Sequence, residues 1–524
     1  MIRPAHHRLA GGMALALILG GCSLAPDYRR PDAPIAAAWP AGPAYEGAAE
    51  NRAGPPAADI GWQECFTDPL LRELIGLSLR NNRDLRVAAL NVQAASALYR
   101  IQRSELLPAI GAGADATMQR TPADLSPSGH ATTSHRYSVG VGMTAFELDL
   151  FGRLRSLRDQ ALESYFAQRE TRTSVQLSLV AEVANAYLSL RAHQQLLALT
   201  QDMLDSQRES YELTRQSYDH DVATALDLSQ AEISVRAAER DMEIYSRAAA
   251  QDLNALRQLA GGPLPDALAA SLAAPGELPD ASVLADLPAG LPSDLLARRP
   301  DVRAAEHELR AANANIGAAR AAFFPIISLT GSAGTASSSL SGLFKAGSGA
   351  WSFVPQITLP IFSGGANQAN LDLAKVEKNI QVARYEAAIQ AAFREVADAL
   401  AARATLDRQV QAQQALETAS GRAYRLAQQR YRQGIDNYLA VLVAQREWMA
   451  AQQALVETRL ARLANLATLY KALGGGWAEH TVDAPAAGPA GPAGSAESAE
   501  SAESAESAGP AGPAGSAEPA AVTG

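Results

Sequence analysis

Few residues of this chain have the types and spacing that catalysis or metal binding needs. Its 524 residues include eight His and two Cys. They contain no Gly-Lys-Ser phosphate loop, no His-Glu-x-x-His zinc motif and no Gly-x-Ser-x-Gly nucleophile motif. His130 and His135 share one polar stretch where a metal site is conceivable, but a solvated loop is the better explanation. We therefore expect no enzyme, no cofactor and no metal site.

Cys22 is the residue whose surroundings predict a defined modification. Residues 1–21 have a positive start and an apolar stretch, Met13 to Leu19, that is too short to span a membrane, as in an export signal. The sequence Leu-Gly-Gly-Cys at 19–22 resembles a bacterial lipobox, in which the Cys becomes the lipid-bearing first residue. An ordinary signal followed by a chance Cys is the alternative. A lipid on Cys22 would attach the chain to a membrane surface without threading it through.

Two further residues bear on that modification. Known bacterial lipoproteins that stay in the inner membrane often carry Asp after the lipidated Cys, so Ser23 points to the outer membrane. With Cys22 acylated, Cys65 has no partner for an intrachain disulfide. We expect Cys65 to be a passive packed thiol.

The predicted secondary-structure elements of the chain occur twice. A run that opens with Asp84-Leu85-Arg86 returns with Asp301-Val302-Arg303, and the Glu182–Ala186 sequence returns as Glu395–Ala399. Such a duplication indicates a structural unit that cannot bury its apolar faces alone. Each half predicts a helix, a β-hairpin, a very long helix, a tight turn and a returning helix.

Four stretches alternate between apolar and small or polar residues, which predicts strands. They lie near 108–120, 136–148, 325–337 and 351–361 and are about as long as membrane-spanning strands, with Ala145 on the apolar face of the second. Four strands cannot close a barrel in lipid, so the chain would contribute a sector of a shared barrel. Two copies would give eight strands and three would give twelve. Two soluble hairpins packed on a core are the alternative.

Long helical stretches follow each hairpin, from about Arg153 to Asp219 and from about Asn367 to Gln433. Neither contains Pro, and roughly 65 helical residues make a rod near 100 Å long. A shorter helix returns after each turn, and another precedes each hairpin, over Leu70–Leu107 and Ser293–Phe324. The predicted fold class is mainly α with a membrane β-barrel sector.

The remaining segments complete the predicted organisation. Low-complexity residues at the carboxyl end, rich in Ala, Gly, Pro, Ser and Glu, favour a disordered tail, and their Glu residues contribute to the net charge of −10. The basic residues are not clustered, so we do not expect nucleic acid as a partner. The predicted parts are a signal peptide at 1–21, a lipidated amino-terminal segment at 22–69, a first repeat at 70–260, a linker at 261–292, a second repeat at 293–474 and the tail at 475–524.

At this point the chain resembles the TolC-like outer-membrane factors of tripartite export systems, in their lipidated OprM-type branch. The resemblance covers nearly everything from Cys22 to about Leu473. The segments that carry it are the lipobox, Trp62 with Phe66–Leu70, Ala297–Val302, Leu359–Phe362 and Tyr431–Leu439.

The resemblance implies an assembly rather than a reaction. It implies a homotrimer whose twelve-stranded outer-membrane barrel continues into a periplasmic α-helical barrel. Members of the family dock a periplasmic adaptor protein and an inner-membrane pump, usually of the resistance-nodulation-division type. The expected function is a passive exit duct for drugs and other small molecules. The helices would close like an iris at the periplasmic end.

The two tight turns, at Asp219–Leu226 and Arg432–Leu439, are the expected gate and docking region. Asp436 is the gate candidate, because three carboxylates around a narrow axis would favour cations and could pair with Arg432 across protomers. Capping of the returning helix by Asp436 or Asn437 is the alternative. Tyr438 would plug the aperture or, more simply, pack between helices. The adaptor-contact candidates, which ordinary turn packing would also explain, are Val222, Ala223, Thr224, Gly434 and Ile435.

One departure from the family pattern lies in the first turn. The family usually has Gly where this chain has His220-Asp221, whereas Gly434 fills the corresponding place in the second turn. Asp tolerates the left-handed conformation better than most residues, so the turn is still expected to form.

Other functions are compatible with the same sequence pattern. The same fold could serve type I protein secretion or metal efflux, although the OprM-like turn and the sparse His and Met favour small molecules. A lipid-anchored periplasmic coiled-coil scaffold without a pore is a different class of protein. The four alternating strands count against that scaffold.

Overall fold

The computed structural model describes residues 23–46, 56–279, 287, 292 and 297–481, all of which belong to one compact unit. The export signal at 1–21, Cys22, part of the predicted linker and the segment 482–524 lie outside the described residues. None of the described helices is both long and apolar enough to cross a membrane.

The described elements follow the predicted order in both halves. The first half contains α3 (Pro69–Asn81), α4 (Arg83–Ser104), β1 (Ile110–Thr121), β2 (Thr132–Glu147), α5 (Arg153–Asp219) and α6 (Ala225–Leu259). The second contains α9 (Pro300–Ala321), β3 (Ile326–Ser337), β4 (Gly349–Thr358), α10 (Ala366–Arg432) and α11 (Tyr438–Ala472). The shorter elements are η1 (Ala57–Asp59), α2 (Trp62–Cys65), α7 (Asp266–Ala273) and η3 (Leu340–Gly342).

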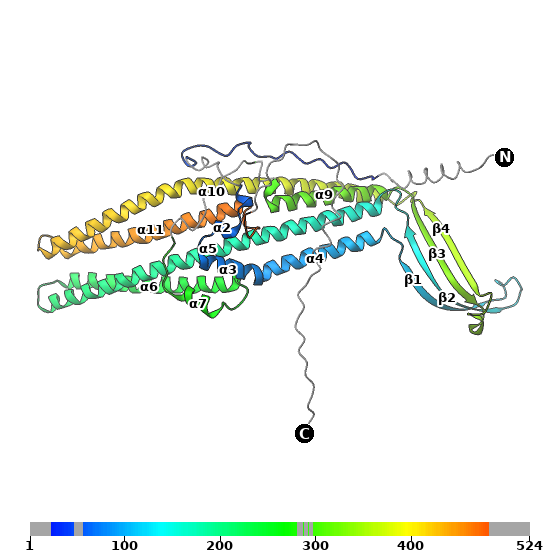
Figure 1. Ribbon diagram of the computed structural model, residues 1–524, viewed down its shortest axis with the longest axis horizontal. Helices are drawn as coiled ribbons and strands as arrows, with labels where there is room; N and C mark the ends of the chain where they lie inside the picture. The colour runs from blue at the N-terminus through cyan, green and yellow to red at the C-terminus, as the bar shows by residue number, and fades with distance from the viewer. Residues whose placement is uncertain (1–22, 47–55, 280–286, 288–291, 293–296, 482–524) are drawn as a thin grey trace, which may run out of the picture. The chain divides into compact units, whose positions relative to one another are not determined.

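The long helices α5 and α10 set the length of the helical part. Each has 67 residues, which corresponds to about 100 Å. Both begin after a left-handed glycine, Gly152 with φ 75° and Gly365 with φ 87°, which turns the chain from the sheet into the helix. Helices α4 and α6 pack along α5, and α9 and α11 pack along α10. The sheet lies beyond one end of these helices and both helical turns lie at the other (Figure 1).

The helix before the first hairpin is interrupted, so the prediction of one helix over Leu70–Leu107 is wrong. The side chain of Asn82 accepts a hydrogen bond from the backbone N–H of Leu85 at 3.0 Å and thereby caps α4. Its amide also donates to the carbonyl of Leu259 at the end of α6, at 3.0 Å. Gly261, with φ 76°, lies so close that a Cβ there would be 2.2 Å from the carbonyl oxygen of Asn81. The break therefore makes room for the chain that leaves α6.

The four strands form one antiparallel sheet in the order β1-β2-β3-β4. Ser138, Ser332 and Ser352 lie on one face because Ser138 pairs with Ala336, and Ser332 pairs with both Gly142 and Ser352. Val139, Val141 and Trp351 lie on the other face, which is apolar. The alternation predicted from the sequence is therefore present in the paired strands.

A β-bulge corrects the predicted position of Ala145. Ala145 has φ 52°, and the register shifts between Met143 and Phe146. After the shift, Phe146 lies opposite Leu329 on the apolar face, and Glu147 lies opposite Ser328. The extra residue thus keeps the large aromatic side chain on the apolar face.

The strand ends follow from their partners. Strand β2 begins at Thr132, earlier than predicted, because Thr132 pairs with Thr121 at the end of β1. Strand β4 ends at Thr358, earlier than predicted, because its partner there, Ile326, is the first residue of β3.

Residues 475–481, predicted to belong to the tail, are instead packed against the segment that leads into α2. The carbonyl of Ala478 accepts a hydrogen bond from the N–H of Trp62 at 3.0 Å, and the indole of Trp477 donates to the carbonyl of Ala58 at 2.9 Å. Trp62 and Cys65 are buried in the same core. Asp68 caps α3 and accepts a hydrogen bond from the Tyr187 hydroxyl of α5 at 2.7 Å. These contacts join residues 475–481 to the segment before α3, which Asp68 in turn fastens to α5.

Residues 23–46, which we call the amino-terminal strap, lie along α9 and α10. Arg320 donates to the carbonyl of Leu24 at 3.0 Å and Asn313 to that of Pro26 at 2.7 Å. Further along, the Trp39 ring stacks on Phe393 with centroids 5.1 Å apart. The approach is close, because a Cβ at Gly317 would lie 2.8 Å from the backbone nitrogen of Ala25.

Glu306 of α9 is the buried charge that holds the strap. Its carboxylate accepts two hydrogen bonds from Arg30, at 3.0 and 2.6 Å, one from Arg310 at 2.7 Å and one from the Tyr28 hydroxyl at 3.2 Å. Burial acts to raise the pKa of Glu306, but Arg30 and Arg310 outweigh it and hold the pKa below its usual value. The ionised carboxylate is thus the form that binds the strap.

We expect Glu306→Gln to loosen the strap and to lower the free energy of unfolding by about 1–3 kcal/mol at pH 7, because charged hydrogen bonds are replaced by weaker ones. Since the folded-state pKa is lowered, the stabilisation is present above the unfolded pKa of about 4.3 and is lost as the pH falls through the folded value. The difference from the parent protein should therefore shrink below about pH 4. Thermal unfolding and limited proteolysis across this range measure it. Glu377→Gln, at an exposed position of α10, is the control, and an equal effect of both variants would contradict the role of Glu306.

Candidate functional site: the helical tips and the sheet

The two helical turns, which we call the first tip (217–227) and the second tip (430–440), have the same backbone structure. In the first tip the N–H of Asp221 donates to Tyr218 at 2.9 Å and that of Val222 donates to Ser217 at 2.8 Å. In the second tip the N–H of Gly434 donates to Tyr431 at 2.9 Å and that of Ile435 donates to Arg430 at 2.9 Å. Each pair satisfies carbonyl groups that the end of a long helix leaves free.

The left-handed residue of this motif differs between the tips. Gly434 has φ 72° and Asp221 has φ 59°. A left-handed conformation costs Gly almost nothing, whereas an L-residue with a Cβ is strained there. The first tip therefore forms with Asp at the strained position, and its backbone matches that of the second.

The returning helices begin with different caps. Thr224 and Asp227 form a capping box at α6, in which the Thr224 hydroxyl accepts from the N–H of Asp227 at 3.2 Å and Asp227 accepts from the N–H of Thr224 at 3.0 Å. Asn437 caps α11 by accepting from the N–H of Ala440 at 3.3 Å. Thr224 is thus already engaged as a cap, and the helix cap of the second tip is Asn437 and not Asp436.

Asp436 forms an ion pair within its own tip. Its two carboxylate oxygens accept hydrogen bonds from Arg430 at 2.6 and 3.0 Å, which lowers the pKa of Asp436. The partner of Asp436 within the chain is thus Arg430 and not the predicted Arg432, whose pairing across protomers stays a prediction. The missed signal was the turn itself, because residues on either side of a left-handed turn are brought face to face. Ser217 and Ala223 occupy the corresponding places in the first tip.

Tyr438 packs between helices. Its hydroxyl is hydrogen-bonded to that of Ser210 on α5, and its ring centroid lies 5.4 Å from that of Tyr431. Burial raises the pKa of Tyr438. The contact joins the start of α11 to α5, so it links the α5–α6 hairpin to the α10–α11 hairpin.

The ends of both tips expose apolar side chains. Val222 is 81% exposed and Ile435 is 56% exposed, next to Ala223 and Gly434. Exposed apolar residues at corresponding positions of a duplicated turn suit contact with another protein.

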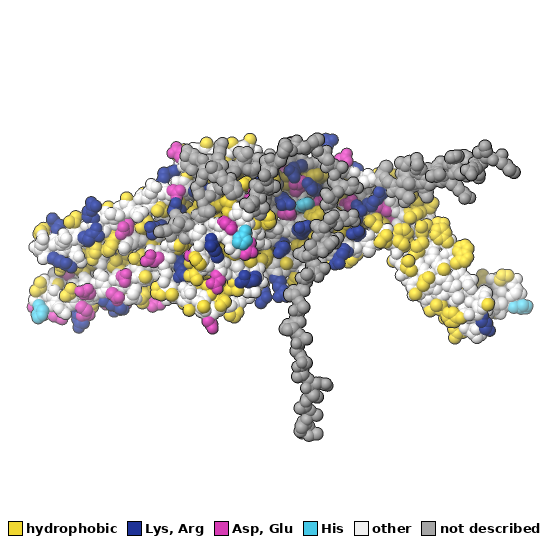
Figure 2. All heavy atoms as spheres, viewed as in Figure 1, with side chains coloured by type: hydrophobic (Ala, Val, Ile, Leu, Met, Phe, Trp, Pro, Cys, Tyr) yellow, Lys and Arg dark blue, Asp and Glu magenta, His cyan; other side chains and the backbone are white. Residues whose placement is uncertain are grey.

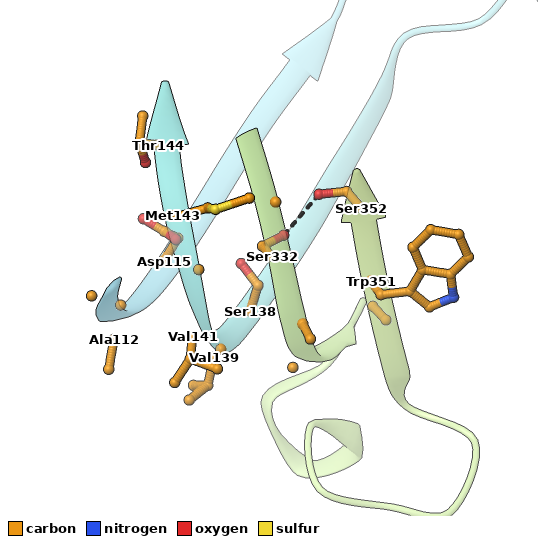
Figure 3. A pocket seen from close by; sticks show the side chains of 18 of the residues that line it. Ala112, Asp115, Ser138, Val139, Val141, Met143, Thr144, Ser332, Trp351 and Ser352 are labelled. Atoms are coloured by element: carbon orange, nitrogen blue, oxygen red, sulfur yellow. Dashed lines mark hydrogen bonds between the residues drawn. The ribbon is translucent and has the colours of Figure 1, made fainter. Parts of the chain in front are cut away.

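The sheet presents the second part of the site. Its small residues leave a hollow of about 640 Å³ that Asp115, Arg136, Ser138 and Ser332 help to line. The hydroxyls of Ser332 and Ser352 are 2.8 Å apart across β3 and β4 (Figure 3). Glycines at 140, 142 and 334 keep this surface low, because a Cβ at any of them would meet the neighbouring strand within 2.8 Å. A wettable surface of this kind suits passage better than tight binding.

Charge is distributed unevenly between the helices and the sheet. Figure 2 shows acidic and basic side chains spread over the helices, whereas the sheet, on the face in view, is apolar or uncharged except near its far end. The exposed apolar residues of the sheet include Val141, Trp351, Phe353 and Ile357. An exposed apolar band on paired strands is what a lipid-facing surface requires.

Within the described residues, no group of three or more His, Cys, Asp or Glu side chains is arranged to hold a metal ion. Cys65 is a buried cysteine.

Comparison with known proteins gives the family context. The sequence model of a family described as outer membrane efflux protein matches residues 74–262 and 291–475. These two segments correspond to the two halves of the duplicated fold.

Individual relatives agree with this match. The chain is 54% identical over 469 residues to an antibiotic efflux pump outer membrane protein, ArpC, of Pseudomonas putida, with 90% of this chain and 96% of ArpC covered. It has the same identity and coverage with a toluene efflux pump outer membrane protein, TtgC, of that species. Among solved structures, the open state of the MtrE outer membrane channel of Neisseria gonorrhoeae superposes with a TM-score of 0.78, at 40% identity, over 88% of this chain and 100% of MtrE.

The two tips offer a matched pair of substitutions. Asp221→Gly should stabilise the first tip and Gly434→Ala should destabilise the second, each by about 1 kcal/mol, because only Gly is unstrained in the left-handed conformation. Amide hydrogen exchange at Val222 and Ile435 measures both changes, which should be about fivefold and of opposite sign. Equal exchange in all three proteins would mean that neither position is strained.

Proposed function

Because the chain belongs to the family of outer membrane efflux proteins, we propose that it is the passive exit duct of a three-part efflux system, carrying drugs and other small molecules to the exterior. The predicted family, fold class and outer-membrane location are confirmed by the relatives that share the fold over most of both chains. The duct needs no reaction of its own, in keeping with the expectation that it is not an enzyme.

The observation that carries the proposal is the open sheet. Strands β1 and β4 are its two edges, and the apolar face between them is exposed. In lipid an unpaired edge leaves backbone groups without hydrogen bonds, so the edges must meet those of other copies. Three copies would close a twelve-stranded barrel.

The helices support the same ring. Helix α4 exposes Val87, Leu98 and Ile101, and α10 exposes Leu373 and Val376. Within the chain, α4 packs on α5, α5 on α9 and α9 on α10. Packing of α4 of one copy on α10 of the next would cover both exposed stripes and continue the sheet into a helical cylinder. This arrangement supports a homotrimer.

The strap supports a lipid anchor at Cys22. Leu24 is held by Arg320, close to Ile326 where the sheet begins. A lipid two residues before this point would be within reach of the membrane that surrounds the sheet. The lipidation of Cys22 is part of the proposal.

The tips would form the periplasmic gate and the docking site. In a trimer, Asp436 with Arg430 would recur three times, with Arg432 beside the neighbouring protomer, and Tyr438 would hold the two hairpins together. Val222, Ala223, Gly434 and Ile435 are proposed to contact a periplasmic adaptor, with Thr224 acting chiefly as the helix cap. The adaptor would connect the duct to an inner-membrane pump of the resistance-nodulation-division type.

Type I protein secretion and metal efflux are the alternatives for the cargo. The relatives ArpC and TtgC are named for efflux of antibiotics and toluene, which favours small organic molecules. The low-relief face of the sheet, where small residues predominate, fits such a cargo, because it offers little that a specific ligand could bind.

Deletion of the gene should raise intracellular accumulation of a fluorescent pump substrate and lower the inhibitory concentrations of several antibiotics, because the exit route is lost. Complementation with the parent gene should restore both values. Complementation with Cys22→Ser tests how far the lipid is needed. Unchanged accumulation after deletion, in a strain that lacks other channels of this family, would contradict the proposal.

We expect Asp436→Ala to raise the closed-state conductance of the purified protein in planar bilayers, because Arg430 is released and the tip loosens. Asp219→Ala, which removes one exposed carboxylate from the first tip and breaks no described ion pair, is the control for charge alone. A conductance that stays at the parent value in Asp436→Ala would exclude Asp436 from the gate.

A further inference from the structure

A cavity of about 380 Å³ lies between the helical hairpin α5–α6 and helix α11. Its walls include Met203 and Gln207 of α5, Ile233 and Ser234 of α6, and Leu442 and Met449 of α11. Cavities of this size hold small organic ligands. The proposed duct function makes no use of it.

Two glutamines that line the cavity carry hydrogen-bond acceptors without a partner among the described residues. Gln207 is only 4% exposed, and its amide N–H donates to the sulfur of Met203 at 3.5 Å. The amide of Gln445, 5% exposed, donates to the same sulfur at 3.4 Å. Among the described residues, none donates a hydrogen bond to the buried Oε1 atoms of Gln207 and Gln230. Buried carbonyl oxygens of this kind need donors, and no described side chain of the lining donates to these two.

The charges at the cavity decide which donors fit. Arg240 is paired with Asp241 at 2.6 Å, and Arg446 adds a second guanidinium to the lining. The net charge of these three side chains is positive, which disfavours an ammonium ligand. Uncharged O–H or N–H groups are the donors that remain.

The apolar walls decide the rest of the ligand. Met203 and Met449 present thioethers, which make favourable contacts with aromatic rings, and Ile233 and Leu442 add aliphatic surface. We propose that this cavity binds a small uncharged aromatic molecule with a hydroxyl or N–H donor, such as a phenol or an indole, whose donor reaches Gln207 or Gln230. The binding does not depend on the proposed duct function.

A ligand in this cavity would touch both hairpins at once. Since α6 and α11 each return from a tip, an occupant would fix their spacing. Any effect on conductance would rest on the proposed gate, whereas the binding can be measured without it.

The binding is tested by fluorine NMR on the purified full-length protein in lipid nanodiscs, with 4-fluorophenol as the probe and empty nanodiscs as the background. The comparison ligand is 4-fluoroanisole, which has a similar shape and no donor. We expect saturable binding of 4-fluorophenol and binding of 4-fluoroanisole that is at least about tenfold weaker, as for loss of a buried hydrogen bond. Equal binding of both ligands, or no signal above empty nanodiscs, would overturn the proposal.

Three variants locate the site. Ser234→Phe fills the cavity and leaves both glutamines in place, so it should abolish binding. Gln207→Leu removes one acceptor and should weaken binding of 4-fluorophenol about tenfold. Gln201→Leu makes the same change at an exposed position of α5 and should bind like the parent.

Light scattering on each variant checks that the assembly is unchanged. If Gln207→Leu fails to assemble, Ser234→Phe and the ligand pair still decide the question. Parent-like binding by an assembled Ser234→Phe protein would place the phenol elsewhere and overturn the assignment. A cryo-electron microscopy map with only ordered water in the cavity at saturating 4-fluorophenol would do the same.

Discussion

The free backbone edges of a four-stranded sheet are the constraint on which the other features depend. The apolar face of this sheet is exposed, which suits contact with lipid, yet lipid offers no hydrogen bonds to the edge strands β1 and β4. One chain cannot satisfy these edges, and the closed form must therefore be shared between copies. The duplicated fold follows from this, since each half delivers one β-hairpin to the sheet and one long helix with two shorter helices to the helical part.

The two long helices, α5 and α10, are each covered by shorter helices. Each long helix has 67 residues, and two shorter helices laid end to end cover it. These are α4 and α6 for α5, and α9 and α11 for α10. The joints between the short helices fall at the waist, where chain enters and leaves the bundle. There Asn82 ends α3, caps α4 and donates a hydrogen bond to the end of α6. Residues 475–481 pack on the segment that contains Trp62 and Cys65.

Repetitive features of this fold could be read from the sequence, and single contacts could not. The alternation of the strands and the absence of Pro over 67 residues depend on local geometry, so the long helices lie within a residue of their predicted ends. The bulge at Ala145 and the break at Asn82 depend on partners far away in the sequence. The pairing of Asp436 with Arg430 depends on the direction of two side chains across a turn, and spacing alone does not give it. Nor does spacing reveal the contact of Tyr438 with Ser210.

The two tips share one backbone and differ in what holds it. The first is closed by a hydrogen-bonded box of Thr224 and Asp227, the second by an exposed pair of opposite charges. Ions in solution weaken the second kind of contact more than the first. Around a ring of three copies, stiff and salt-sensitive tips would alternate. A cylinder whose backbone has nearly sixfold symmetry would thus have only threefold symmetry in its mechanical stiffness. A rise in ionic strength would loosen the second tip of each copy and leave the first tip nearly unchanged.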